Sequence, residues 1–212
     1  MQHYGGMVVL EENNFILNWR TLFQKELKLD INGISELYDI SDIFDEIEFK
    51  QFSRFPKIDL EGIKSNYVEM FYQKVLDKSI SKSNYEIEEK RIHDTVSMFW
   101  VYDDLYYCRC LSKKDVKKTN GYKTKKALFH NTVNNISCSS TYIDALYPVN
   151  FGEELSSLLY IATRGVPDVW FLGRKSKTLL VISDCILLAF NPDNDYQFLT
   201  EIALSNGLLE LK

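Results

Sequence analysis

The chain has 212 residues, of which 45% are hydrophobic and 26% are charged, and its formal net charge is −5. A chain of this length buries roughly 70% of its unfolded surface, so one hydrophobic core can hold it without disulfide bonds. The composition excludes an intrinsically disordered protein, and the acidic balance argues against a dedicated nucleic-acid-binding protein.

Helical patterns dominate the N-terminal part of the chain. Apolar side chains recur at helical spacing over residues 15–28, and the turn-forming segment that ends at Gly33 is expected to stop this helix. Residues 34–47 predict one broken helix or two short ones, with Ser41 as a cap between them. A longer helix is predicted over residues 59–76.

Residues that favour β-structure become frequent after residue 95. Aromatic and β-branched runs at residues 96–102 and 105–111 flank two aspartates, which predicts a β-hairpin. Asn120 and Gly121 predict a second tight turn, which would place the neighbouring lysines on a projecting β-ribbon. The later chain predicts one helix, three strands and a closing helix, in this order: residues 153–164, 169–172, 178–182, 186–190 and 196–204.

The order of these elements predicts the fold class. Helices come first, and strands interrupted by helices follow, which is typical of an α+β protein. We therefore expect an N-terminal helical segment followed by a mostly antiparallel sheet with packed helices. The chain is interpreted as a single domain over residues 1–212, with possible sub-lobes at residues 1–90 (helical) and 91–212 (sheet-containing).

The sequence predicts a cytoplasmic protein that does not associate with membranes. Residues 1–12 lack the cationic region and long apolar run of a secretory signal, and the apolar run at residues 185–190 is too short to cross a bilayer. A domain of this size does not need disulfide bonds, so we expect the four cysteines to be reduced thiols: Cys108, Cys110, Cys138 and Cys185.

Negative charge is concentrated in one segment. Between residues 30 and 48 there are seven acids and no lysine or arginine: Asp30, Glu36, Asp39, Asp42, Asp45, Glu46 and Glu48. Like charges at helical spacing repel, so a segment of one sign gives up local ion pairs. The acids either form a docking surface for a basic partner, or line a solvated helix face that the protein's own lysines balance in space.

Positive charge is concentrated in a second segment. Eight cations oppose a single aspartate between residues 109 and 126: Arg109, Lys113, Lys114, Lys117, Lys118, Lys123, Lys125 and Lys126. With its neighbouring tyrosines, such a segment can bind nucleic acid through phosphates and bases. Lysines at a hairpin tip also protect a sheet edge against aggregation. We favour the second interpretation and do not expect nucleic acid as a partner.

The sequence contains no nucleophile elbow, no zinc-protease motif and no phosphate-binding loop. A zinc site would have to combine Cys108, Cys110, His130 and Cys138, but the usual paired cysteine spacing is absent. We therefore expect no catalytic residues, no metal and no cofactor.

One segment resembles an enzyme family. Residues 164–171, Arg-Gly-Val-Pro-Asp-Val-Trp-Phe, resemble the Pro-Asp opening of the PD-(D/E)xK nuclease superfamily, and the resemblance covers about twenty residues. It implies that Asp168 and a second acid on the next strand, Asp184, bind a divalent metal. The lysine that the family places two residues later is replaced here by Ile186. A metal-dependent nuclease, or a degenerate relative that binds nucleic acid, is the alternative hypothesis.

The leading hypothesis is a non-enzymatic cytoplasmic protein that neutralises a partner protein, such as a toxin or nuclease, by covering its basic functional surface. Immunity proteins and antitoxins are of this type. The predicted contacts are six carboxylates and one aromatic anchor: Glu36, Asp39, Asp42, Asp45, Glu46, Glu48 and Tyr38. A self-associating scaffold protein is a third possibility.

Overall fold

The structure, a computed structural model, describes residues 19–34, 43–44, 46–53, 82–108, 127, 146–164, 169–183 and 186–211. The predicted helix at residues 59–76 and the predicted turn at Asn120 and Gly121 lie outside these residues. So does the whole lysine-rich stretch at residues 113–126.

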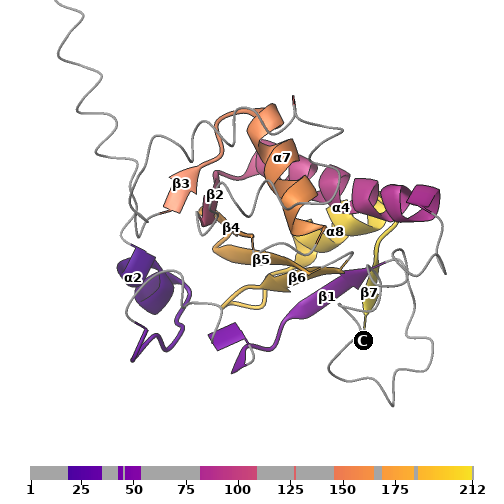
Figure 1. The fold of residues 1–212 in the computed structure, drawn as a ribbon. Helices are drawn as coiled ribbons and strands as arrows, with labels where there is room; N and C mark the ends of the chain where they lie inside the picture. Colours follow the sequence, from indigo (N-terminus) through magenta and orange to yellow (C-terminus); the bar gives the residue numbers. More distant parts are fainter. Residues whose placement is uncertain are drawn as a thin grey trace, which may run out of the picture.

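Seven described strands form one sheet in which every pair of neighbours is antiparallel (Figure 1). The strands are β1 (Lys50–Ser53), β2 (Leu105–Cys108), β3 (Leu146–Pro148), β4 (Trp170–Gly173), β5 (Thr178–Ser183), β6 (Ile186–Phe190) and β7 (Leu209–Leu211). Their order across the sheet is β3-β2-β4-β5-β6-β1-β7. The predicted α+β class with a mostly antiparallel sheet is confirmed, and β4, β5 and β6 form where the sequence predicts strands.

The centre of the sheet is buried on both faces, because successive side chains of a strand point to opposite sides. Phe171 of β4 and Leu180 of β5 belong to one hydrophobic cluster, whereas their neighbours Trp170 and Leu179 belong to a second cluster on the other face. A strand with two buried faces is a continuous apolar run in sequence. This is why β4, β5 and β6 are recognisable from the sequence.

Three helices cover the first face of the sheet: α4 (Lys82–Tyr102), α7 (Gly152–Ala162) and α8 (Gln197–Ser205) (Figure 1). α7 and α8 confirm the predicted helices at residues 153–164 and 196–204. The chain leaves α8 through Gly207, whose φ of 78° lies in the left-handed region that glycine adopts readily.

The predicted hairpin of residues 96–102 and 105–111 is wrong in its first strand. Residues 96–102 are the last turns of α4, and β2 begins only at Leu105. Buried side chains recur every three or four residues along α4: Tyr85, Glu88, Glu89, Ile92, Thr95, Val96 and Phe99. Because three of these side chains are polar or charged, the helical periodicity of apolar residues is weak, and the aromatic and β-branched composition suggests a strand instead.

A short N-terminal helical unit packs on the second face of the sheet. It consists of α2 (Trp19–Thr21) and the π-helical turn η1 (Leu22–Glu26), within the predicted helix at residues 15–28. The fully buried Phe23 contacts Trp170 of β4 edge to face, with ring centroids 5.5 Å apart. The helical unit ends before Gly33, because Lys28 already has a positive φ of 55°.

A buried ion pair joins α4 to the end of α7. The Nε and Nη2 atoms of Arg164 donate hydrogen bonds to the two carboxylate oxygens of Glu89 at 2.9 and 3.0 Å, and the Thr163 hydroxyl donates a third at 2.8 Å. The guanidinium also lies 4.1 Å from the ring centroid of Tyr160. Burial alone would lower the pKa of Arg164, but the hydrogen bonds and charge of Glu89 raise it.

None of the described helices combines the length and the apolar character that a membrane span requires.

The Glu89–Arg164 pair generates a stability prediction. Arg164→Met leaves the Glu89 carboxylate buried without its cation, which we expect to lower the free energy of unfolding by about 3–5 kcal/mol. The double variant Glu89→Leu, Arg164→Met removes both charges, so its free energy of unfolding should fall less than that of the single variant. Urea unfolding followed by circular dichroism measures both.

The control is the exposed pair of Lys90 and Asp94 on the same helix. Lys90→Met should change the free energy of unfolding by less than about 1 kcal/mol. If the free energy of unfolding falls equally in the Arg164 single variant and in the double variant, the unpaired carboxylate is not what destabilises the protein.

Candidate interaction site

Two of the seven predicted contact residues, Glu46 and Glu48, are among the described residues, and both are exposed. The other five lie outside them: Glu36, Tyr38, Asp39, Asp42 and Asp45. Asp30, at the start of the acidic segment, is also exposed, and its carboxylate accepts a hydrogen bond from the backbone of Asn32 at 3.0 Å. Each described acid of the segment therefore faces solvent.

The exposed glutamates are held by apolar neighbours in the sequence. The Phe44 and Phe49 rings contact edge to face at 5.7 Å, and both pack against the second hydrophobic cluster. The amide of Ile47 donates to the carbonyl of Phe44 at 3.2 Å, which closes a short turn. The chain then enters β1, where Phe52 is fully buried. Glu46 and Glu48 thus stand on a segment that is anchored on both sides.

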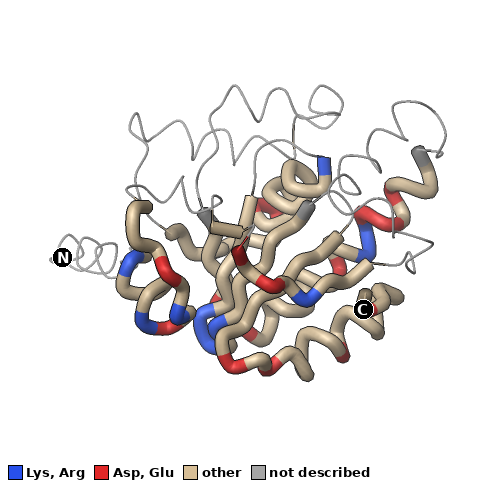
Figure 2. Tube along the Cα trace, turned by 90° about the horizontal axis from the view of Figure 1, so that it is seen from below, with Lys and Arg blue, Asp and Glu red and all other residues tan. Residues whose placement is uncertain are grey.

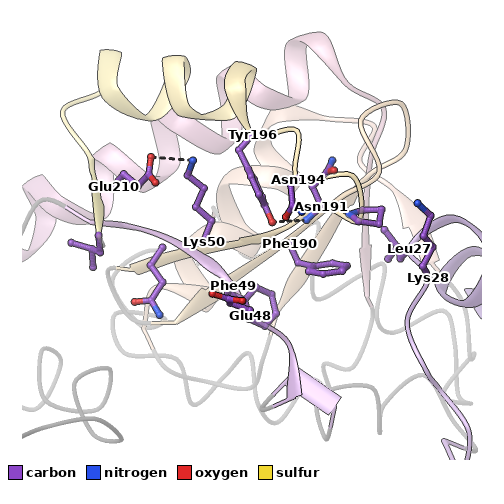
Figure 3. A pocket seen from close by; sticks show the side chains of 13 residues that line it. Leu27, Lys28, Glu48, Phe49, Lys50, Phe190, Asn191, Asn194, Tyr196 and Glu210 are labelled. Atoms are coloured by element: carbon purple, nitrogen blue, oxygen red, sulfur yellow. Dashed lines mark hydrogen bonds and ion pairs between the residues drawn. The ribbon is translucent and has the colours of Figure 1, made fainter.

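A pocket of about 750 Å³ opens beside Glu48. Its walls are the end of η1, the strands β1, β6 and β7, and the turn that connects β6 to α8. Figure 3 places Lys50 and Glu210 at one side of this pocket, Leu27 and Lys28 at the other, and Phe190 between them. The pocket therefore brings together four segments that are far apart in the sequence.

The turn between β6 and α8 forms one wall of the pocket, and the buried Asn191 side chain holds it by hydrogen bonds in several directions. Its Oδ1 accepts from the amides of Asp193 and Asp195 at 2.9 and 3.2 Å. Its Nδ2 donates to the carbonyl of Ser176 at 2.7 Å. Asn191 is not among the residues that the sequence pattern singles out, although asparagine before proline is typical of a turn that the side chain itself stabilises.

Two ion pairs border the pocket. Lys28 donates to the carboxylate of Asp193 at 2.7 Å, and Lys50 lies 3.0 Å from the carboxylate of Glu210. Lys50 also sits 5.1 Å from the ring centroid of Tyr196. No described lysine or arginine lies within ion-pair distance of Glu48.

The described acids and bases are interspersed along much of the chain. Figure 2 shows basic and acidic positions close together in the region of α2 and η1, where Lys25 and Lys28 are neighbours of Glu26 and Asp30. The two described cations that line the pocket of Glu48, Lys28 and Lys50, are engaged with other acids.

The residues of the metal hypotheses lie mostly outside the described part of the chain. Cys108 ends β2, whereas Cys110, His130 and Cys138 are not described. The same holds for the nuclease-like aspartates Asp168 and Asp184. Within the described residues, no group of three or more histidine, cysteine, aspartate or glutamate side chains is placed to hold a metal ion.

Comparison of the chain with protein-family models, with curated proteins and with solved structures yields no match.

The pocket's border generates a prediction about pH. The hydrogen bond and the charge of Lys28 lower the pKa of Asp193. The pair is therefore intact above this lowered pKa and is lost as the pH falls through it. Lys28→Met should return the pKa of Asp193 towards that of an ordinary aspartate, as measured by NMR titration of the side-chain carboxyl carbon.

Lys25→Met is the matched control, because it removes a lysine of the neighbouring η1 without touching this pair. A pKa of Asp193 that stays the same in the Lys28 variant would contradict the assigned cause.

Proposed function

We propose that this protein is a non-enzymatic, cytoplasmic binding protein that neutralises a partner protein by covering a basic functional surface, as immunity proteins and antitoxins do. The observation that carries the proposal is the segment of seven acids without a cation between residues 30 and 48. Its proposed contacts are Glu36, Tyr38, Asp39, Asp42, Asp45, Glu46 and Glu48.

Exposure and charge support the proposal at the described acids. Asp30, Glu46 and Glu48 all face solvent, and no described lysine or arginine forms an ion pair with any of them. Carboxylates that are not paired within their own protein keep their charge available to a partner. This is the condition that distinguishes a docking surface from a surface whose charges are cancelled internally.

The anchoring of the segment also supports binding. Association is weakened by the entropy lost when mobile loops and side chains become ordered, and a segment that is already fixed loses less. At its C-terminal end the acidic segment continues into β1, which pairs with both β6 and β7. Lys50 is the first residue of β1, and Glu48 precedes it by two residues. The position of Glu48 is therefore fixed closely by the sheet.

The electrostatic character of the proposed contact defines how the complex should behave. Opposite charges accelerate the encounter of two proteins and exclude partners of the wrong sign. Salt screens these interactions over a Debye length of about 8 Å at physiological ionic strength. We therefore expect the association rate constant of the complex to fall steeply as salt is added.

Charge reversal in the acidic segment tests the proposal. The partner is first isolated from the native host on the immobilised protein and identified, and its own activity is assayed. The triple variant Asp39→Lys, Asp42→Lys, Glu46→Lys should bind it at least about a hundredfold more weakly, because each reversal replaces an attraction by a repulsion. Surface plasmon resonance at several salt concentrations measures the affinity and the association rate.

The matched control reverses three exposed acids on the helices of the first face: Glu86→Lys, Glu153→Lys and Glu201→Lys. Both triple variants change the net charge by the same amount, so a general charge effect would appear equally in the two. The proposal is refuted if the acidic-segment variant retains the wild-type affinity and salt dependence, or if the bound wild-type protein leaves the activity of the partner unchanged.

A further inference from the structure

Two lysines and two glutamates line the pocket, but they are not all paired with one another. Lys28 and Lys50 are the two lysines of the lining, and each already holds a carboxylate, that of Asp193 or that of Glu210. Glu48 is the lining carboxylate with which neither of these ammonium groups pairs. An added anion would have to compete with Asp193 or Glu210 for its lysine. An added cation would meet a carboxylate that no described lysine or arginine occupies.

The pocket also offers aromatic surface. Phe49 and Phe190 line it, are only partly buried, and contact each other edge to face at 6.5 Å. Aromatic faces attract cations, and arginine is the cation that most often packs on them because its guanidinium is planar and weakly hydrated. The ring of Tyr196, a further lining residue, is already approached by Lys50 and shows that the pocket accommodates a cation over a ring.

We propose that this pocket receives an arginine side chain of the partner protein, with the guanidinium paired to the Glu48 carboxylate and packed against Phe49 or Phe190. The inference rests on the proposed function and names the chemistry by which the partner is recognised. A lysine would satisfy the charge of Glu48, but it lacks the flat surface that matches the rings and the fork that binds a carboxylate through two hydrogen bonds.

The size of the pocket and the hydrogen bonds of its wall agree with a side chain presented by a protein. Its volume of about 750 Å³ lies within the roughly 300–1,000 Å³ typical of ligand pockets, and so admits an arginine with part of its backbone. The wall formed by the Asn191 turn is held by hydrogen bonds to Ser176, Asp193 and Asp195. An arginine inserted into such a pocket at the end of the acidic segment would set the register of the partner along it.

The probe for the test is N-acetyl-L-arginine amide, titrated into the 15N-labelled full-length protein and followed by NMR. We expect saturable shifts of the Gln51 and Asn191 amides, with weaker binding of N-acetyl-L-lysine amide. Glu48→Gln keeps the shape of the side chain and removes its charge, and should weaken arginine binding about three- to fivefold, as for an exposed ion pair. Glu201→Gln, an equal change at an exposed residue of α8 outside the pocket lining, should leave it unchanged.

Three outcomes would overturn the inference: no saturable shift at these amides, equal binding to the Glu48→Gln and wild-type proteins, or preferential binding of inorganic phosphate. The isolated partner then separates this inference from the proposed function. If the triple variant of the acidic segment loses the partner while Glu48→Gln binds it as wild type does, the proposed function stands and the arginine pocket falls. If arginine amide binds as expected but the triple variant of the acidic segment binds the partner as wild type does, the proposed function is refuted and the arginine pocket stands.

Discussion

The placement of β1 between β6 and β7 is the constraint on which the arrangement of the site depends. Its Phe52 is fully buried in the cluster under the helices, so the strand cannot leave the sheet without exposing a large aromatic side chain. The register pairs Lys50 with Ala189, and the preceding Phe49 then contacts Phe190. β1 also pairs with β7, which carries Glu210. One strand thereby holds Glu48, Lys50 and a wall of the pocket in place.

The buried carboxylates and the exposed carboxylates of the acidic segment differ in their pairing. Buried carboxylates have assigned partners: Glu89 binds Arg164, and Asp103 accepts from the amides of Lys175 and Ser176 at 2.8 and 3.0 Å. Such pairing is required because an isolated buried charge is costly. Glu46 and Glu48 are exposed and do not carry this cost. Their lack of described cationic partners is therefore compatible with folding.

The sequence predicts the centre of the sheet well and its borders poorly. β5 and β6 are buried on both faces and appear as continuous apolar runs. β1 is missed because Phe52 is the single apolar residue in its four, and β7 is missed because its side chains are exposed or only partly buried. Both strands exist because of backbone pairing with neighbours far along the chain, which no local pattern records. The misassigned end of α4 has a different cause: buried polar side chains such as Glu88 and Glu89 weaken the apolar periodicity of the helix, and residues 96–102 have the composition of a strand.

The same distinction between local pattern and tertiary structure applies to the candidate site. From the sequence alone, the segregation of acids into residues 30–48 and the apolar character of the central strands are determined, because both are properties of neighbouring residues. Only the tertiary structure decides that Lys28 pairs with Asp193, 165 residues away, and that Lys50 pairs with Glu210. With Lys28 and Lys50 engaged in these long-range pairs, Glu48 is the carboxylate of the aromatic-lined pocket that no described lysine or arginine pairs with. The physical reason is that Coulomb interactions depend on distance in space, and the fold alone sets that distance.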